Sequence, residues 1–212
     1  MKQYNGEKAI ISLTSWKARI STVAKTIYSL VKQCPGFHIV LVLSEEEFPR
    51  KEAELPENLM LFVDNDLLEI LWVYKNYKSF KKVLFTMDKY RDVPVISADD
   101  DCIYTCNYAQ ELYDIWVKYK DNPIAYRRSK IPFCPCGPAT LYPPQIYPIF
   151  LDAFKNYNTS SYQDDGFFLK ILKELNKHPI YVKDKFPCVF HDEISPLTGS
   201  TSNSAWFRDQ SF

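Results

Sequence analysis

The sequence predicts an α/β protein built on a central, mostly parallel sheet flanked by helices. Short apolar runs typical of buried strands alternate with segments in which apolar residues recur at helical spacing. The 212 residues suit a single domain, and an apolar content of 46% supplies enough side chains to cover both faces of such a sheet. We therefore expect one domain over residues 1–212.

The first half of the chain carries the regular alternation. Apolar runs that end in polar turns predict its strands, at residues 8–13, 38–43, 59–63, 69–74 and 93–96, with 69–74 at an edge. Apolar residues at helical spacing predict helices at residues 20–31 and 79–90, and the first ends at the Cys34-Pro35-Gly36 turn. Ser44 and the three glutamates after it favour the start of a further short helix.

The second half has fewer regular signals. Apolar spacing from Tyr108 to Tyr119 predicts an amphipathic helix, and Asp164 with Asp165 opens another. The remaining expected elements are strands at residues 124–128 and 181–182, a loop at 131–148 and a turn of helix near 146–154. The polar residues 195–212 are expected to form a flexible tail.

The stretch Val93-Pro94-Val95-Ile96-Ser97-Ala98 leads directly into three carboxylates, Asp99, Asp100 and Asp101. Unpaired buried charge is too costly for all three to belong to the core. In an extended segment Asp99 and Asp101 point to one side and Asp100 to the other. The first and third could therefore share one divalent cation, while the middle one turns inward to accept hydrogen bonds. The alternative is an acidic turn that caps the next helix.

Polar side chains also follow other strands of the expected sheet. Thr14, Ser15 and Arg19 follow the first strand, and Asp64 with Asp66 follows the third. In an open α/β sheet ligands bind beyond the carboxyl ends of the strands. Hydroxyls, a guanidinium group and a bound metal together suit a nucleotide diphosphate.

The composition excludes several classes of function. The formal net charge is zero, so no general electrostatic attraction for nucleic acid is expected. Only five glycines are present, and neither glycine-rich phosphate-loop pattern occurs. No signal peptide or membrane-spanning run is found, which predicts a cytoplasmic protein with reduced cysteines. The spacing of Cys102, Cys106, Cys134 and Cys136 is unlike that of common zinc sites.

The chain contains the following motifs in this order: Ile10-Ile11-Ser12-Leu13-Thr14-Ser15-Trp16-Lys17-Ala18-Arg19-Ile20, Lys81-Lys82, Asp99-Asp100-Asp101, Leu141-Tyr142-Pro143-Pro144 and Asp164-Asp165. Together they resemble a bacterial glycosyltransferase family with the GT-A fold, a Rossmann-like architecture of nucleotide-diphospho-sugar transferases. The resemblance covers residues 10–191 and rests on the order and spacing of these motifs. It implies a donor-binding half over residues 1–106 and an acceptor half over 107–194.

The resemblance also implies roles for individual residues. Asp99, Asp100 and Asp101 would form the DXD motif, which binds Mn²⁺ or Mg²⁺ and, through the metal, the diphosphate of a nucleotide sugar. Thr14, Ser15 and Arg19 would lie at the nucleotide, where the expected strand ends also place Asp66, and Lys82, or alternatively Lys81, would face the phosphates. His191 would complete the metal shell, unless it is an ordinary loop histidine.

Asp164 and Asp165 resemble the acidic pair on the acceptor side of inverting enzymes of this fold, which usually reads Glu-Asp. A transfer that inverts the sugar needs a base for the acceptor hydroxyl, and we expect Asp165 to serve. The alternative is that both residues only cap the helix. The loop Cys134-Pro135-Cys136-Gly137-Pro138-Ala139 departs from the glycine-rich loop of relatives, so the acceptor loop is expected to differ in shape.

The expected function is therefore metal-dependent transfer of a sugar, with a UDP-sugar favoured, to a glycan or lipid-linked acceptor in bacterial surface polysaccharide synthesis. Such an acceptor leaves room for peripheral contact with the inner face of the membrane. One alternative is a nucleotidylyltransferase, although no glycine-rich loop follows the first strand. Another is a non-catalytic carbohydrate-binding module, for which aromatic residues such as Trp16, Trp72 and Tyr142 would suit sugar stacking.

Overall fold

The computed structural model describes residues 6–33, 35–126, 139–157, 164–182 and 188–190. A seven-stranded sheet runs through its centre in the order β3-β2-β1-β4-β7-β6-β8. Its strands are β1 (Ala9–Thr14), β2 (Phe37–Ser44), β3 (Glu69–Val73), β4 (Val95–Ser97), β6 (Ile124–Tyr126), β7 (Thr140–Tyr142) and β8 (Ile180–Val182). Only β7 runs against its neighbours, so the sheet is mostly parallel, as the sequence predicts.

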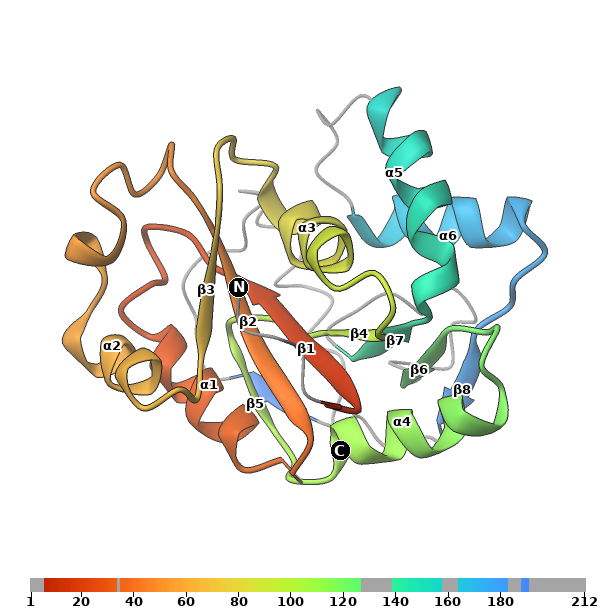
Figure 1. Ribbon diagram of the computed structural model, residues 1–212, viewed down its shortest axis with the longest axis horizontal. Coiled ribbons are helices and arrows are strands. Elements are labelled where there is room, and N and C mark those ends of the chain that lie inside the picture. Colours follow the sequence, from red (N-terminus) through yellow and green to blue (C-terminus); the bar gives the residue numbers. More distant parts are fainter. Residues whose placement is uncertain (1–5, 34, 127–138, 158–163, 183–187, 191–212) are drawn as a thin grey trace, which may run out of the picture.

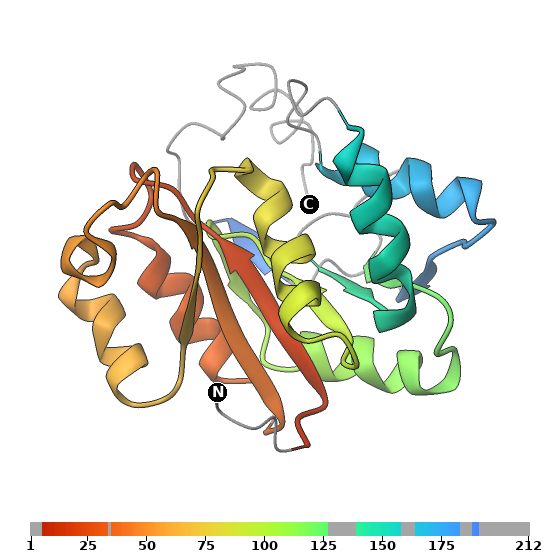
Figure 2. The same ribbon diagram turned by 45° about the horizontal axis from the view of Figure 1, so that its top comes forward.

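Helices cover both faces of this sheet. They are α1 (Val23–Val31), α2 (Glu57–Asp64), α3 (Lys81–Lys89), α4 (Tyr108–Lys118), α5 (Tyr147–Lys155) and α6 (Asp164–Glu174). Short 3₁₀ turns lie at Lys51–Glu54, Lys78–Phe80 and Pro144–Ile146. Figure 1 shows α3, α5 and α6 on one face and α1 with α4 on the other, and Figure 2 shows that α1 and α2 lie at the β3 end of the sheet.

The alternation along β1 explains these two layers. Ala9, Ile11 and Leu13 pack into one core with α1 and α4, while Ile10 packs into the other core with α3, α5 and α6. Both sets are fully buried, as expected for a parallel strand with helices on each side. A small antiparallel ladder of β5 (Cys102–Tyr104) and β9 (Cys188–Phe190) lies beside α1, and this pairing was not predicted from the sequence.

The expected strand at residues 59–63 is wrong, because these residues belong to helix α2. A short apolar run cannot be assigned to strand or helix by periodicity alone. In the structure Leu59, Phe62 and Val63 face the core at helical spacing, while Leu61 is 58% exposed. Pro56 before the helix and Glu57 in its first turn are the start signals that outweigh the apolar run.

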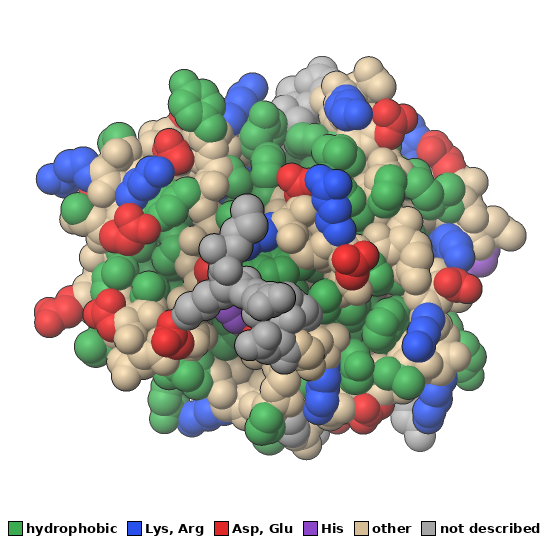
Figure 3. Space-filling view, in the orientation of Figure 1, with side chains coloured by type: hydrophobic (Ala, Val, Ile, Leu, Met, Phe, Trp, Pro, Cys, Tyr) green, Lys and Arg blue, Asp and Glu red, His purple; other side chains and the backbone are tan. Residues whose placement is uncertain are grey.

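The expected strand at 69–74 is confirmed as the edge strand β3. The helices expected near residues 20–31 and 79–90 are confirmed with slightly later starts, and the helix expected from Tyr108 begins at that residue. Residues 131–138 and the tail at 195–212 lie outside the described part of the chain. The expectation of a loop over 131–148 is wrong for residues 140–142, which form strand β7 between β4 and β6. None of the helices in the described residues is both long and apolar enough to cross a membrane. On the face shown in Figure 3, acidic and basic side chains are interspersed, which agrees with a net charge of zero.

A cluster of aromatic rings fixes α6 against α3. The ring of Phe80, at the start of α3, lies 5.4 Å from that of Phe167 and 6.1 Å from that of Phe168 on α6. Phe154 of α5 lies 5.2 Å from Phe80, again between ring centres. These separations are within the range of favourable aromatic pairs. The first turn of α6 is therefore held beside the first turn of α3, and both turns carry residues of the candidate site.

Candidate active site

The site forms where β1 and β4 end side by side. The two strands are parallel neighbours, with Ser12 opposite Ser97, and the backbone N–H of Ala98 donates to the carbonyl of Ser12 at 2.8 Å. The residues that follow each strand consequently meet at one edge of the sheet. This brings Thr14 and Ser15 close to the three aspartates, as predicted from the sequence.

Asp100 turns inward, as the alternation of an extended segment predicts. Its carboxylate accepts a hydrogen bond from the hydroxyl of Ser15 at 2.6 Å and from the guanidinium of Arg19 at 2.6 Å, and the residue is 3% exposed. Burial raises the pKa of Asp100, while the charge of Arg19 and the Ser15 hydroxyl act to lower it. Burial lowers the pKa of Arg19, but Asp100 and Asp101 outweigh this and raise it. Arg19 is therefore a buried counter-ion of the aspartates.

The hydroxyls expected at the nucleotide are engaged within the protein. Thr14 donates to the carbonyl of Val42 on β2 at 2.7 Å, and Ser15 donates to Asp100. Both residues are buried. Ser15 therefore supports Asp100 directly, whereas Thr14 ties the end of β1 to β2. A residue that the sequence did not single out, Thr26 of α1, adds to this support by donating to the carbonyl of Asp100 at 2.9 Å.

Asp99 and Asp101 remain accessible, with side chains 30% and 18% exposed. Burial raises the pKa of Asp101 to about 6, and the negative charge of Asp99 adds to the effect. Arg19 acts in the opposite direction, at 3.0 Å from the Asp101 carboxylate. Asp101 is thus a carboxylate whose negative charge is only partly compensated.

Lys82 connects these carboxylates to α6. Its ammonium donates to Asp99 Oδ1 at 2.7 Å and lies 3.5 Å from Asp164 Oδ2. Its backbone is fixed to β1 because the hydroxyl of Ser12 donates to the Lys82 carbonyl at 2.6 Å and lies 2.7 Å from that of Thr86. The structure therefore brings Lys82 and Asp164 together with the aspartates.

Two other predicted residues do not join this group. Lys81 is buried and points toward the Glu47 carboxylate at 3.2 Å and the Asn76 side-chain oxygen at 2.9 Å, and burial lowers its pKa. Asp66 follows α2 and precedes β3, so it lies at the amino ends of the parallel strands, as does Asp64 at the end of α2. Their expected placement at the carboxyl ends is wrong, because it depended on the misassigned strand at 59–63.

Two further predicted residues have side chains that are not described. Asp165 belongs to the first turn of α6, but its side chain lies outside the described part of the structure. His191 lies outside the described residues altogether, immediately after β9. β9 pairs with β5, and Phe190 lies opposite Cys102. The last residue of β9 therefore lies beside the residue that follows Asp101.

The charges favour binding of a divalent cation. Four carboxylates, those of Asp99, Asp100, Asp101 and Asp164, face the two fixed cations Arg19 and Lys82, which leaves an excess of two negative charges. Within the described residues, no three ligating side chains converge on one point. Mg²⁺ is commonly held by one or two carboxylates together with substrate phosphates, and Asp99 with Asp101 fits that arrangement.

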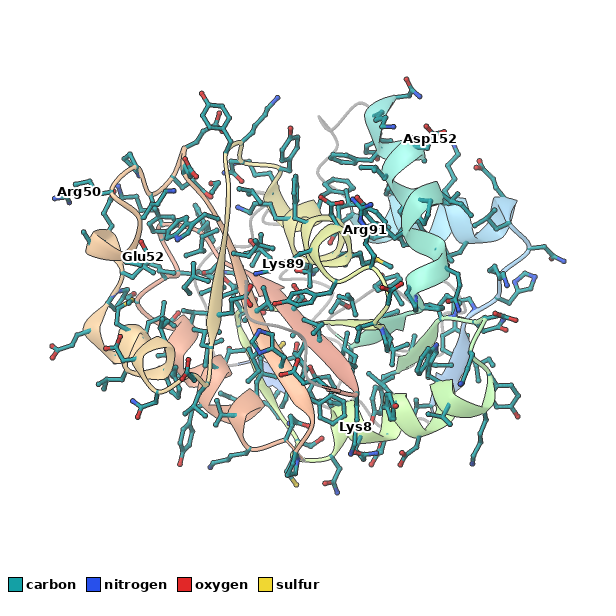
Figure 4. All side chains as sticks on the ribbon, in the orientation of Figure 1. Lys8, Arg50, Glu52, Lys89, Arg91 and Asp152 are labelled. Carbon is teal, nitrogen blue, oxygen red and sulfur yellow. The ribbon has the colours of Figure 1, made fainter. Side chains whose placement is uncertain are left out.

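A groove of about 690 Å³ lies elsewhere, between the turn that follows α3 and helix α5. Figure 4 labels Arg91 and Asp152, which line it together with Tyr147 and Leu151. Arg91 precedes β4, so the groove lies at the amino end of that strand, away from the aspartates. Its lining mixes apolar side chains with both signs of charge. The chemistry of the side chains, and not the size of a cavity, therefore identifies the candidate site.

No protein-family model and no curated protein matches the sequence. Solved structures are similar in fold. The structure of S. aureus TarS 1–349 in complex with UDP-GlcNAc has a TM-score of 0.62 at 11% identity, over 91% of this chain and 61% of that one. The mannosyltransferase PcManGT from Pyrobaculum calidifontis, in complex with GDP-Man and Mn²⁺, has a TM-score of 0.58 at 11% identity, over 85% and 56%.

The glycosyltransferase GlyE of Streptococcus pneumoniae has a TM-score of 0.50 at 16% identity, over 85% of this chain and 46% of GlyE. This chain thus spans less than two thirds of each of these structures. At such low identities the similarity concerns the fold. The chain has the GT-A-like α/β fold of these glycosyltransferases, which agrees with the fold class predicted from the sequence.

Proposed function

We propose that this chain is a glycosyltransferase that moves a sugar from a nucleotide sugar, a UDP-sugar in preference, to a glycan or lipid-linked acceptor with the help of Mn²⁺ or Mg²⁺. The observation that carries the proposal is the pair Asp99 and Asp101 at the carboxyl end of β4, with an excess of negative charge and Lys82 and Asp164 beside it. The structural relatives with UDP-GlcNAc or with GDP-Man and Mn²⁺ support the choice of donor and metal.

The residues have separate tasks in this reaction. Asp99 and Asp101 would hold the metal, which would supply Lewis-acid stabilisation of the negative charge on the leaving nucleoside diphosphate. Arg19 and Asp100 fix the backbone that carries them. His191, which follows β9, is the candidate third ligand from the protein. Thr14 and Ser15 form the floor beneath the nucleotide.

Transfer with inversion breaks the bond between the sugar C1 and the diphosphate oxygen while the acceptor oxygen bonds to C1. The acceptor hydroxyl loses its proton, and Asp165 is the proposed base, with Asp164 beside it. A positioned base contributes typically about 10²–10⁴-fold to the rate. Residues 1–106 would thus bind the donor, residues 107–194 would receive the acceptor, and residues 195–212 would form a tail.

We place this reaction in bacterial surface polysaccharide synthesis, at the cytoplasmic side of the membrane. A lipid-linked acceptor would bring the enzyme into peripheral contact with the inner face. These assignments rest on the sequence resemblance and on the acceptor class that it implies.

Calorimetric titration with UDP tests the proposal directly. We expect UDP to bind in the presence of Mn²⁺ and to lose most of its affinity in EDTA. Asp101→Asn should abolish the metal dependence, whereas the control Asp92→Asn, an exposed aspartate before β4, should have no effect. Binding of UDP that is equally tight in EDTA would contradict the proposed metal site, and binding of a glycan without any UDP binding would indicate a carbohydrate-binding module.

A further inference from the structure

Lys82 occupies an unusual position for a phosphate ligand. Its side chain is only 7% exposed, and its ammonium lies between two carboxylates from different elements, Asp99 after β4 and Asp164 at the start of α6. The contact with Asp99 is short, at 2.7 Å, and the distance to Asp164 is 3.5 Å. The hydrogen bond from Ser12 to its carbonyl fixes the backbone of Lys82, so the side chain is the part that can change partners.

The two contacts of Lys82 are unequal in a way that has consequences for metal binding. Asp99 is also a proposed metal ligand, and an ammonium next to it repels a divalent cation. Asp164 Oδ2 is buried and makes no hydrogen bond among the described residues, so it can accept the ammonium if the lysine leaves Asp99. A buried carboxylate oxygen that accepts no hydrogen bond is costly, and a closer approach of Lys82 to Asp164 Oδ2 would relieve that cost.

We propose that Lys82 is a positioning residue that exchanges partners: it neutralises Asp99 until a divalent cation binds there and then pairs with Asp164. Arrival of the metal would thus orient a carboxylate on the acceptor side. This inference rests on the proposed function, because it takes Asp99 to be a metal ligand. It assigns to Lys82 a role that differs from direct contact with the donor phosphates.

The proposal fixes the sign of a measurable effect. If Lys82 competes with the cation for Asp99, removal of its charge should tighten Mn²⁺ binding in the absence of any nucleotide. The expected change is about tenfold, since one unit charge a few ångströms from a divalent ion has an effect of this size even at the dielectric constant of water. A lysine whose ammonium lies away from Asp99 would change this affinity far less.

The experiment is calorimetric titration of Mn²⁺ into the full chain without nucleotide. Lys82→Met should bind Mn²⁺ about tenfold more tightly, and Lys82→Arg, which keeps the charge, should bind it like the wild type. Lys81→Met is the matched control, because Lys81 is the adjacent buried lysine of the same helix but pairs with Glu47. If Lys82→Met does not fold, Lys82→Gln, which keeps a hydrogen-bond donor without the charge, is measured in its place.

The outcomes distinguish failure of the partner exchange by Lys82 from failure of the proposed function. Unchanged or weaker Mn²⁺ binding in folded Lys82→Met or Lys82→Gln would overturn the exchange of partners. Tighter binding in Lys81→Met to the same extent would also overturn it, because the effect would then be one of general charge. A wild-type chain that binds neither Mn²⁺ nor UDP would instead refute the proposed function itself.

Discussion

Substituting the three consecutive aspartates one at a time should separate support of the fold from binding of the metal. Asp100 is the buried member, and both of its carboxylate oxygens accept hydrogen bonds, from Arg19 and Ser15. Asp100→Asn keeps the shape but removes the charge and turns one acceptor into a donor. Breaking a buried ion pair on one side costs about 3–5 kcal/mol. We expect a loss of about 3 kcal/mol, because Asp101 still lies 3.0 Å from Arg19.

In a chain of this length 1 kcal/mol shifts the midpoint of thermal unfolding by about 2–4 °C, so Asp100→Asn should lower it by about 6–12 °C. Asp101→Asn should leave the midpoint unchanged or raise it. The folded-state pKa is raised for both carboxylates, to about 6 for Asp101, so the folded chain holds each of them ionised at a cost at neutral pH. Asp100→Asn differs because it also leaves a buried donor of Ser15 or Arg19 without an acceptor. Equal midpoints for the two variants, measured by circular dichroism at pH 7 in EDTA, would refute this division of roles.

Three further predictions concern other groups. Asp165→Asn should lower kcat by about two to four orders of magnitude with UDP binding unchanged, and a larger loss in Asp164→Asn would reverse the assignment within the pair. Glu69→Gln should cost about 3 kcal/mol at pH 7: burial raises the pKa of Glu69, but hydrogen bonds from His38, Lys89 and Tyr90 lower it to about 2. That stabilisation is present above the unfolded pKa near 4.5 and is lost as the pH falls toward 2, so the wild type and Glu69→Gln should converge in urea titrations at low pH. The exposed control Asp92→Asn should match the wild type throughout. Phe80→Ala should destabilise the chain by about 3–5 kcal/mol in the same urea titrations, as is usual for a buried aromatic residue, and an effect below 1 kcal/mol would show that the ring cluster does not hold α6.

The parallel sheet and the position of the aspartates could be predicted because both depend on local patterns. A strand that is buried on both faces is apolar throughout, and its last residue determines where the next polar side chains emerge. The inward turn of Asp100 follows from the same alternation. The prediction of a strand at residues 59–63 was wrong because five consecutive apolar residues fit the periodicity of a strand and that of a helix equally well. The exposure of Leu61, which distinguishes the two, depends on the tertiary structure.

The partners of the charged residues could not be predicted in the same way. Lys81 and Lys82 are adjacent in the sequence, yet one pairs with Glu47 and the other with Asp99. Successive residues on a helix point about 100° apart, so only the placement of α3 on the sheet decides which lysine reaches the aspartates. The support of Asp100 by Thr26 was missed for a similar reason, although a polar residue on the apolar face of α1 is a usable signal.

The aromatic cluster explains how a site with two halves keeps its geometry. Phe80 comes two residues before Lys82, and Phe167 and Phe168 come one helical turn after Asp164. The packing of these rings therefore also sets how far the Lys82 ammonium lies from the Asp164 carboxylate. A buried ion pair is weak evidence for stability, whereas the burial of large rings is a strong contribution. In this chain the packing of the aromatic rings supplies the stabilising free energy. The same packing places the Lys82 ammonium close enough to Asp164 for the two to form an ion pair. A change that loosens the rings should accordingly weaken the link between the metal carboxylates and α6 even though every charged residue is retained.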